Sequence, residues 1–298
     1  MPGREPLNVA VLGAGLIGLD LVTKIQRSPS LTCGLVVGRN NEARGLRQAA
    51  SLGCLTAAEG IDSLVAAQDP FDIVFDATNA MAHTEHWARL KPFGTLVVDL
   101  TPSRVGHMVA PTVNGADALM HGNVNLISCG GQASIPILHA LAQRYTPEYI
   151  EVVTTAASHS VGRATRQNLD EYIETTQDAV RTFTGVRDVK AIVNLSPARP
   201  PATFRVAMSA VIPDATVESV NALVAAAADE VRGYVPGYEV AACTVTDERV
   251  FIAVEVTATG DRIPRYAGNL DIINSAAILI AEQYATNQDL VGATKELS

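Results

Sequence analysis

Short apolar runs alternate with helical stretches through the first half of the chain. Residues 8–12 (NVAVL) and 31–37 (LTCGLVV) are uninterrupted and rich in β-branched residues, as buried strands are, and a helix is predicted over 16–27. Strands that are buried on both faces occur in parallel sheets covered by helices. The pattern therefore predicts a doubly covered parallel sheet. Its other strands are expected at 72–75, 95–99 and 123–127.

The pattern changes after residue 129. The strands expected there are longer, and several alternate in polarity, as in an antiparallel sheet with one covered face. Apolar residues at helical spacing predict helices over 166–183 and 217–231, and a last helix over 269–284 that packs back on the first domain. The strands expected in this half are 149–155, 191–195, 204–211, 240–245 and 250–257.

Composition and charge exclude several classes of protein. The 298 residues are 48% hydrophobic and 18% charged, which excludes a disordered chain. A net charge of −9 argues against a nucleic-acid surface, which needs clustered Lys and Arg. No apolar run approaches the roughly 20 residues of a membrane span, and the start of the chain is not signal-like. The 4 cysteines lack CxxC spacing, so we expect no metal site, no disulfide framework and a cytoplasmic location.

Three glycines form the motif GAGLIG between a predicted strand and a predicted helix. This is the context of a dinucleotide-binding turn, in which the helix N-terminus holds the pyrophosphate. The first glycine permits the turn, the second lets the backbone approach the phosphates, and the third allows close packing. A Rossmann turn that binds another ligand is the alternative. The candidate cofactor contacts are Gly13, Ala14, Gly15, Leu16 and Ile17, together with Thr78 at the end of a neighbouring strand.

The second strand lacks the acidic end that usually binds the ribose 2′-hydroxyl of NAD. It is followed by Gly38-Arg39-Asn40-Asn41, and the first acid is Glu42. Arg39 suits a 2′-phosphate, because a guanidinium group matches phosphate oxygens. In the other interpretation Arg39 is a solvated loop residue. Both NAD and NADP therefore stay open.

A cysteine stands between a predicted strand and a helix predicted over 133–142. The field of a helix N-terminus is expected to lower the pKa of Cys129. Gly130 and Gly131 are expected to leave room for a substrate carbonyl, and their amides to form an oxyanion hole. A thiolate beside a nicotinamide indicates sulfur attack on an aldehyde, hydride transfer, and a thioester that a second thiol or water resolves. The other cysteines are expected to be structural.

Nearly the whole chain resembles the acylating acetaldehyde dehydrogenases of aromatic and sterol catabolism, and the resemblance rests on six segments. Members of that family convert short aldehydes, NAD and coenzyme A into acyl-CoA. They partner a 4-hydroxy-2-oxovalerate-type aldolase that passes the aldehyde through a channel. The cysteine motif and YAGNLDI are the specific signals. The segments are VFDATNAMAH (74–83), VVDLTPSRVG (97–106), NVNLISCGGQASIP (123–136), TRQNLDEYIETT (165–176), YVPGY (234–238) and YAGNLDIINSAA (266–277).

The resemblance implies roles for individual residues. It implies that Cys129 is the acyl-thioester nucleophile and that Asn269 reaches the nicotinamide carboxamide. A family aspartate falls on Val206, so a general base must come from elsewhere. His83 and His159 are candidates, because histidine titrates near neutral pH, with a structural role as the alternative for each. The candidate contacts in the cofactor loop are Ser160, Val161, Gly162, Arg163 and Asn168.

The predicted function is an acylating aldehyde dehydrogenase that interconverts a short aldehyde, coenzyme A and NAD(P)+ with acyl-CoA and NAD(P)H through Cys129. Two alternatives stay open: a semialdehyde dehydrogenase-like enzyme with phosphate as acyl acceptor, and a non-catalytic homologue that stabilises an aldolase. The alternating strands leave one sheet face for self-association, so a homodimer or hetero-oligomer is expected. The predicted fold is α/β, with a Rossmann-type domain (1–128), an α+β catalytic and dimerisation domain (129–268) and a returning C-terminal helix (269–298).

Overall fold

The computed structural model describes residues 5–260 and 262–287. The chain divides into two compact units. Unit 1 comprises the residues up to Leu126 and those from Asn274 onward, and unit 2 comprises Ile127–Ile273. The boundaries predicted from the sequence lie close to these divisions. Helix α10 (Gly268–Thr286) contributes to both units.

Unit 1 is built on a 7-stranded sheet in the order β3-β2-β1-β4-β5-β7-β6. All of its strand pairs are parallel, as the apolar runs predicted. The chain winds outward from β1 in both directions, so the switch point where such sheets bind ligands lies between β1 and β4. The strands are β1 (Leu7–Leu12), β2 (Leu31–Val37), β3 (Thr56–Ala57), β4 (Ile73–Asp76), β5 (Leu96–Asp99), β6 (His107–Met108) and β7 (Asn123–Asn125).

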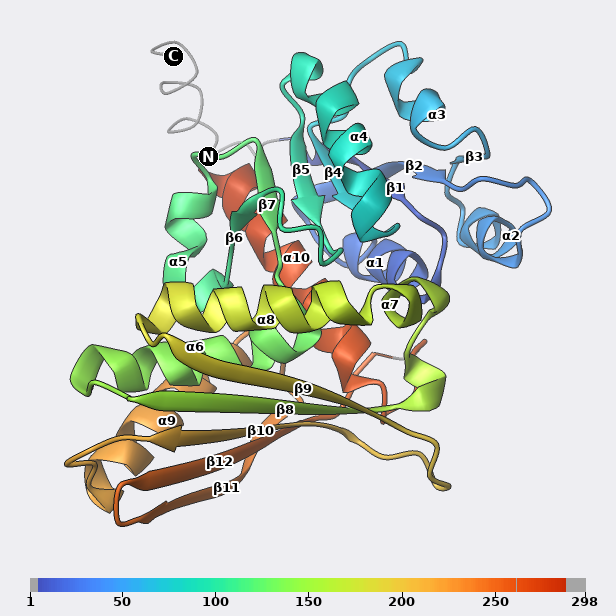
Figure 1. Cartoon of the computed structure of the whole chain (residues 1–298). Coiled ribbons are helices and arrows are strands. Elements are labelled where there is room, and N and C mark those ends of the chain that lie inside the picture. The colour runs from blue at the N-terminus through green and yellow to red at the C-terminus, as the bar shows by residue number, and fades with distance from the viewer. Residues whose placement is uncertain (1–4, 261, 288–298) are drawn as a thin grey trace. The chain divides into compact units, whose positions relative to one another are not determined.

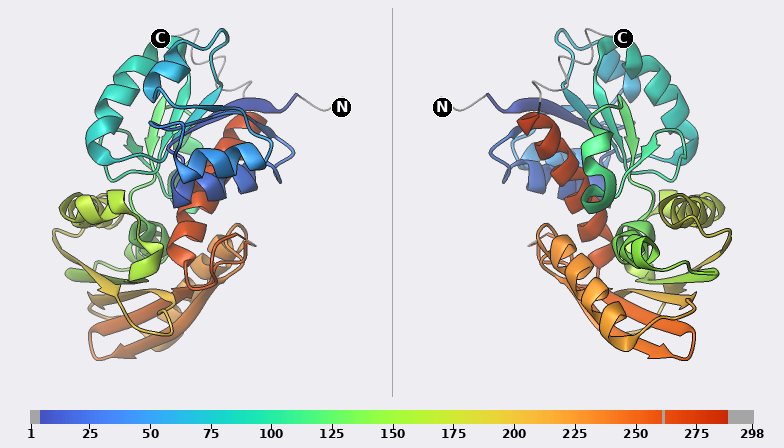
Figure 2. Two further views of the ribbon diagram at one scale, coloured as in Figure 1. Left: turned by 90° about the vertical axis from the view of Figure 1, so that its right-hand side faces the viewer. Right: turned by 90° about the vertical axis from the view of Figure 1, so that its left-hand side faces the viewer.

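Helices cover both faces of this sheet (Figures 1 and 2). On one face lie α3 (Ile61–Val65) and α4 (Ala80–Leu90), which is followed by the 3-10 turn η1 (Lys91–Phe93). On the other face, α1, α2 and α5 lie beside the part of α10 that belongs to unit 1. Their bounds are Leu16–Ile25 for α1, Arg44–Ser51 for α2 and Pro111–Ala118 for α5.

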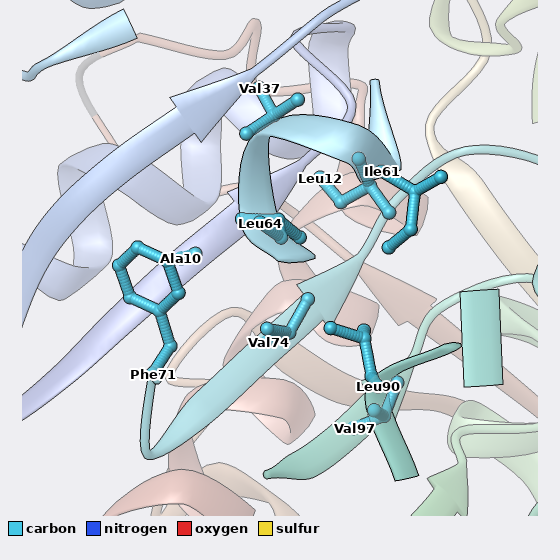
Figure 3. Close-up of a cluster of buried hydrophobic side chains, with 9 residues drawn as sticks. All are labelled: Ala10, Leu12, Val37, Ile61, Leu64, Phe71, Val74, Leu90 and Val97. Atoms are coloured by element: carbon cyan, nitrogen blue, oxygen red, sulfur yellow. The ribbon is translucent and has the colours of Figure 1, made fainter. Parts of the chain in front are cut away.

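A cluster of buried hydrophobic side chains fills the space between the strands and helices α3 and α4 (Figure 3). Full burial of one such side chain stabilises the fold by roughly 1.5–3 kcal/mol. Packing of this kind, rather than helix propensity, therefore holds a helix as short as α3. The cluster consists of Ala10, Leu12, Val37, Ile61, Leu64, Phe71, Val74, Leu90 and Val97.

Polar contacts join α10 to α1 within unit 1. The Asn274 side chain donates to Asp20 Oδ2 at 2.7 Å, and Lys24 Nζ donates to Ser275 Oγ at 3.0 Å. Both Asp20 and Asn274 are buried, where a missing partner would be costly. These bonds confirm that the C-terminal helix packs back on the first domain.

Unit 2 is built on a 5-stranded sheet in the order β11-β12-β10-β8-β9. The pairs from β11 to β8 are antiparallel, as predicted. The expectation is wrong for β9, which runs parallel to β8, because two helices form a crossover between them. The strands are β8 (Tyr149–Ala157), β9 (Asp188–Ser196), β10 (Phe204–Val211), β11 (Tyr238–Thr246) and β12 (Arg249–Val256).

Helices α6 (Cys129–Arg144), α8 (Leu169–Thr184) and α9 (Val217–Arg232) cover one face of this sheet (Figure 1). The helix predicted from residue 133 thus begins earlier, at Cys129. The helix predicted over 166–183 is two helices, because the backbone of Asn168 is not helical. The first of these is α7 (Arg163–Gln167), which follows the 3-10 turn η2 (Ser158–Ser160).

No helix covers the second face of the sheet among the described residues of unit 2 (Figure 1). Phe251 on β12 is 40% exposed, and it pairs across strands with Ser209 of β10. Two cross-strand ion pairs, Arg205 with Glu255 and Lys190 with Glu151, flank this face. Such a face suits self-association.

None of the helices in residues 5–260 and 262–287 has both the length and the apolarity that crossing a membrane requires.

Candidate active site

The glycine turn lies at the switch point of unit 1. Gly13 follows β1 with φ +111°, and a Cβ there would lie 2.6 Å from the carbonyl oxygen of Ala77 in the β4–α4 turn. A Cβ on Gly18 would overlap the carbonyl oxygen of Gly13. The turn and packing reasons given for the first and third glycines are therefore confirmed. The same approach brings the backbone of Thr78 beside Gly13.

The N-terminus of α1 is open. Gly15 is its N-cap; among the described residues no side chain caps it, and a Cβ on Gly15 would meet no atom within 4 Å. Ala14 and Ile17 are half-buried, and Leu16 is 50% exposed. The first amides of a helix bind anions when nothing else occupies them. This helix end has the space and the donors for a pyrophosphate.

Arg39 is exposed directly after β2, where the ribose end of a dinucleotide lies in Rossmann folds. Sequence reasoning missed Gly45, near the start of α2. A Cβ on Gly45 would lie 1.8 Å from the carbonyl oxygen of Ala14, so α2 begins in direct contact with the glycine turn. The only signal in the sequence was a glycine inside a predicted helical spacer.

His83 lies in a fully buried polar cluster of unit 1. Its Nδ1 is 2.9 Å from Asp76 Oδ2, and its Nε2 is 3.1 Å from the Asn123 side-chain nitrogen. His86 Nδ1 contacts the same Asp76 oxygen at 2.8 Å. Burial opposes the charged imidazole, but the Asp76 hydrogen bond and the negative charge of Asp99 outweigh it and raise the pKa of His83.

The two carboxylates of this cluster respond in opposite directions. Burial raises the pKa of Asp99 to about 6. Burial also acts on Asp76, but its hydrogen bonds to His83 and His86 hold the pKa of Asp76 well below the usual range. With no exposure and both ring nitrogens occupied, His83 has no free atom for a substrate. The prediction of His83 as a catalytic base is therefore corrected to a structural role.

Cys129 is the first residue of α6 in unit 2. The preceding Ser128 is the N-cap, and its Oγ accepts from the Gly131 amide at 2.9 Å. The Gly130 amide donates to Tyr172 Oη at 2.8 Å. Protein oxygens thus occupy both amides that were expected to form an oxyanion hole. That expectation is wrong for this conformation.

Gly130 and Gly131 are required for close packing within the protein, not for the approach of a substrate. A Cβ on Gly130 would lie 2.3 Å from Thr154 Oγ1 and 2.7 Å from Tyr172 Oη. A Cβ on Gly131 would lie 2.6 Å from Ile127 Cγ2. The space is therefore filled by the protein's own side chains, not left for a substrate carbonyl.

The Cys129 thiol is not acidified. The residue is half-buried, and the protein packed around it raises the pKa of Cys129 to about 11. Hydrogen bonds from Tyr172 and from the Gly130 amide lower the pKa by less than burial raises it. The expectation of a lowered pKa is wrong, because desolvation raises the pKa of Cys129 by more than the hydrogen bonds at the helix end lower it.

Sequence reasoning missed the side chains that hold Cys129. Tyr172 Oη lies 3.2 Å from Cys129 Sγ, and Thr176, one turn later on α8, contacts Ser128 Oγ at 2.8 Å. Residues four apart share one helix face, so α8 presents both hydroxyls to the start of α6. The segment TRQNLDEYIETT contained both residues, but its helical spacing was interpreted only as packing.

The loop before α8 brings two of the predicted cofactor residues together. Asn269 donates from its side-chain nitrogen to the Ser160 carbonyl at 3.0 Å, and both residues are buried. Its Oδ1 is buried with no hydrogen-bond partner in the part of the chain that the structure describes. A buried acceptor without a donor is costly, so this oxygen fits an N–H supplied by a ligand.

The other candidates in this loop differ in exposure. His159 is exposed, and no hydrogen bond joins it to Cys129 among the described residues. Val161 and Asn168 are buried, and Gly162 is half-buried with open space where a Cβ would be. The side chain of Arg163 lies outside the described part of the chain. A role for His159 in catalysis stays a prediction.

Comparison with known proteins identifies the family. A family model described as "Prokaryotic acetaldehyde dehydrogenase, dimerisation" matches residues 129–264. An acetaldehyde dehydrogenase from Streptomyces griseus subsp. griseus is 60% identical over 290 residues, which cover 97% of this chain and 94% of the relative. This chain belongs to the acetaldehyde dehydrogenase family. Relatives from Pectobacterium atrosepticum (43% over 287 residues; 95% and 97% covered) and Burkholderia pseudomallei strain 668 (43% over 290 residues; 96% and 97% covered) support the assignment.

A solved structure shares the fold of this acetaldehyde dehydrogenase family member. It is aspartate semialdehyde dehydrogenase II from Vibrio cholerae, solved in complex with ASA. The TM-score is 0.67 at 13% sequence identity, covering 95% of this chain and 99% of that chain. At this identity the likeness concerns the fold alone, and it agrees with the predicted Rossmann-type and α+β domains.

Val206, where the resemblance places a family aspartate, is fully buried on β10. It pairs directly with Thr154 on β8, the strand that faces Gly130. In this family member a valine side chain therefore stands next to the hydroxyl cluster, and it has no proton to exchange. The groups that touch the cysteine turn from α8 and β8 are hydroxyls.

Proposed function

We propose that the chain is an acylating aldehyde dehydrogenase that forms a thioester on Cys129 and transfers the acyl group to coenzyme A. The observation that carries the proposal is the placement of Cys129. It begins α6 as a half-buried thiol, held against Tyr172, in a chain of which nearly all is similar to acetaldehyde dehydrogenases. A nucleophile whose position is fixed by a hydrogen-bonding partner is a usual arrangement for covalent catalysis.

The residues present fit a nicotinamide dinucleotide. In unit 1, the open N-terminus of α1 with Gly13, Ala14 and Gly15 suits the pyrophosphate. Considered by itself, unit 2 has a buried acceptor, Asn269 Oδ1, that suits an N–H donor of a ligand. When bound, the nicotinamide ring supplies hydride acceptance and donation.

Cys129 carries the covalent steps. Its thiol releases a proton to solvent, the sulfur bonds to the aldehyde carbon, and the carbonyl oxygen takes up the displaced electron pair. Departure of hydride from that carbon restores the carbonyl and leaves a thioester on Cys129. The coenzyme A thiolate then attacks the thioester, and Cys129 leaves as a thiolate that regains its proton. Because its pKa is about 11, little of the thiol is ionised at neutral pH, so the rate should rise with pH.

The ribose end of the site supports NADP as well as NAD. Arg39 is exposed after β2, and the four residues that follow the strand include no acid. A guanidinium group pairs with a 2′-phosphate, whereas a carboxylate at this position would repel it. We therefore expect 2′-phosphorylated dinucleotides to bind, and Arg39→Ala to weaken NADPH binding while leaving NADH binding unchanged.

The uncovered sheet face of unit 2 supports a homodimer. The family model that matches this unit is described as a dimerisation domain. The face combines the exposed Phe251 with charged pairs at its sides. An aldolase partner stays a prediction from the resemblance.

The decisive experiment is a panel of acyl-CoA thioesters assayed with NADH and with NADPH. Cys129→Ser should lower turnover by about 10³-fold or more while the melting temperature and dinucleotide binding stay unchanged. Cys243→Ser, on β11, is the matched control and should behave as the wild type. Undiminished turnover in Cys129→Ser would overturn the proposal. Coenzyme A-independent turnover with phosphate would instead select the semialdehyde alternative, and absence of dinucleotide binding would select the non-catalytic one.

A further inference from the structure

We propose that Tyr172 is a catalytic residue that donates its phenolic hydrogen bond to the Cys129 sulfur and stabilises it as the attacking thiolate. This inference deepens the proposed function and rests on it for the role of Cys129 as nucleophile. It starts from the contact of Tyr172 Oη with Cys129 Sγ at 3.2 Å.

The hydrogen-bond inventory of the phenol fixes the direction of this contact. A tyrosine hydroxyl has one hydrogen to donate and two lone pairs that accept. The Gly130 amide donates to Tyr172 Oη at 2.8 Å, so the phenolic oxygen already acts as an acceptor. The phenolic hydrogen is left, and the thiolate of Cys129 has only acceptor capacity. Once the thiol has lost its proton, the phenol is therefore the donor.

The phenol is held firmly in place for this role. Tyr172 is buried on α8, and a Cβ on Gly130 would come within 2.7 Å of its oxygen. On the next turn of α8, Thr176 holds the N-cap Ser128 of α6. The two helices are thus joined at both the sulfur and the cap. A donor held in advance stabilises a developing anion without the cost of reorganising at the moment of reaction.

Among the described residues of unit 2, no ionised side chain contributes to the pKa of the Cys129 thiol. The Tyr172 hydroxyl lowers the pKa of the Cys129 thiol the most, and the backbone amides of Gly130 and Cys129 lower it further. On α8, the first-turn carboxylates Asp170 and Glu171 do not contribute to that pKa. On β8 the facing group is the neutral hydroxyl of Thr154. Removal of the phenol should therefore raise the pKa of the thiol further.

The test measures alkylation of Cys129 by iodoacetamide against pH, quantified on the Cys129 peptide by mass spectrometry in the full-length protein. Tyr172→Phe should move the midpoint of the rate profile upward by about one pH unit and slow alkylation at pH 8 about tenfold. Tyr149→Phe, which removes a phenolic hydroxyl from β8 beside Glu151, is the matched control and should not move it. An unchanged midpoint in a folded Tyr172→Phe protein overturns the inference.

A second variant decides the matter if Tyr172→Phe does not fold. Thr154→Val keeps the shape of the side chain but removes the hydroxyl that lowers the pKa of Tyr172, so the phenol should become a weaker donor and the midpoint should move the same way by a smaller amount. No movement in that variant also overturns the inference. Alkylation needs neither dinucleotide nor acyl-CoA. If the protein showed no acyl-CoA turnover but Tyr172→Phe still raised the alkylation midpoint, the proposed function alone would be contradicted. If the protein turned over acyl-CoA but Tyr172→Phe left the alkylation midpoint unchanged, the inference about Tyr172 alone would be contradicted.

Discussion

Two strand-to-helix turns of this protein share a glycine-rich signature and differ in what their helix ends do. The turn from β1 to α1 has Gly15 as its N-cap, and no side chain in the described part of the chain caps it. The turn into α6 has Ser128 as its N-cap, whose oxygen takes the Gly131 amide, while Tyr172 takes the Gly130 amide. One helix end is left open, and the other is closed by the protein's own hydroxyls.

The difference shows that a helix N-terminus acts as a site only through the amides that remain free. The open end of α1 keeps donors for an external anion such as a pyrophosphate. At α6 the Gly130 and Gly131 amides donate to protein oxygens, so they form no oxyanion hole. The pKa of Cys129 stays above its ordinary value because burial outweighs the hydrogen bonds to the sulfur. The closed end instead fixes the position of a sulfur atom against Tyr172. Both turns are rich in glycine, and the side chains packed around each helix end determine whether its amides are free to bind a ligand.

Among glycine and cap variants of the two turns, the largest effect should come from Gly130→Ala, which disturbs the closed turn at α6. Gly130→Ala would place a methyl group where Thr154 Oγ1 and Tyr172 Oη now lie. Overpacking of this kind costs about 1–3 kcal/mol, and a displacement of about 1 Å near a nucleophile costs roughly 100-fold in rate. We expect at least that loss of acyl-CoA reduction, measured by steady-state kinetics, together with a lower melting temperature.

The control for this variant is Gly233→Ala at the end of α9. Its backbone is helical, and a Cβ there meets only the Glu230 carbonyl oxygen, at 3.1 Å. It should lose little activity. If Gly130→Ala retained full turnover, the close packing against Tyr172 and Thr154 would not be needed for catalysis. The claim that the closed turn positions Cys129 would then be contradicted.

Local pattern predicted most elements, and contacts distant in sequence account for the failures. The predicted strands 31–37 and 204–211 agree with β2 and β10 to the residue, because uninterrupted β-branched runs and alternation are local signals. The direction of β9 was wrong, since it depends on the crossover through α7 and α8. Tyr172 was missed for the same reason: its partner Cys129 is 43 positions away in the chain.

The site was predictable where chemistry depends on residue type and not where it depends on surroundings. Cys129 was singled out by its place between a strand and a helix. Its raised pKa was not predictable, because burial on folding, invisible in the sequence, dominates it. His83 was a candidate base only until its burial against Asp76 and Asn123 became visible.

In the β1–α1 turn, alanine at Gly13 should lower the stability of the fold, whereas alanine at Gly15 should lower dinucleotide affinity. Gly13→Ala forces a side chain into φ +111° and against the Ala77 carbonyl, so we expect a loss of about 1–3 kcal/mol in urea unfolding. Gly15→Ala meets nothing in the protein, so stability should change by less than about 1 kcal/mol. Its dinucleotide affinity should still fall about tenfold, which corresponds to about 1.4 kcal/mol.

Fluorescence titration with NADH and NADPH measures this second effect. Wild-type affinity in Gly15→Ala would show that no phosphate approaches this backbone, and the open end of α1 would then not be the binding site. Equal destabilisation by both alanines would show instead that Gly15 is required by the fold.

The smallest effect should come from the cap itself. Ser128→Ala removes the acceptor of the Gly131 amide and the partner of Thr176, and loss of an N-cap costs about 1 kcal/mol. Thr216→Ala removes the comparable cap of α9, where the Thr216 hydroxyl accepts from the Ser219 amide, and should cost a similar amount in urea unfolding. Only Ser128→Ala should change the alkylation rate of Cys129, because only that cap lies beside the sulfur and holds α8 against it. If both variants left alkylation unchanged, the closure of α6 would stabilise the helix without positioning the nucleophile.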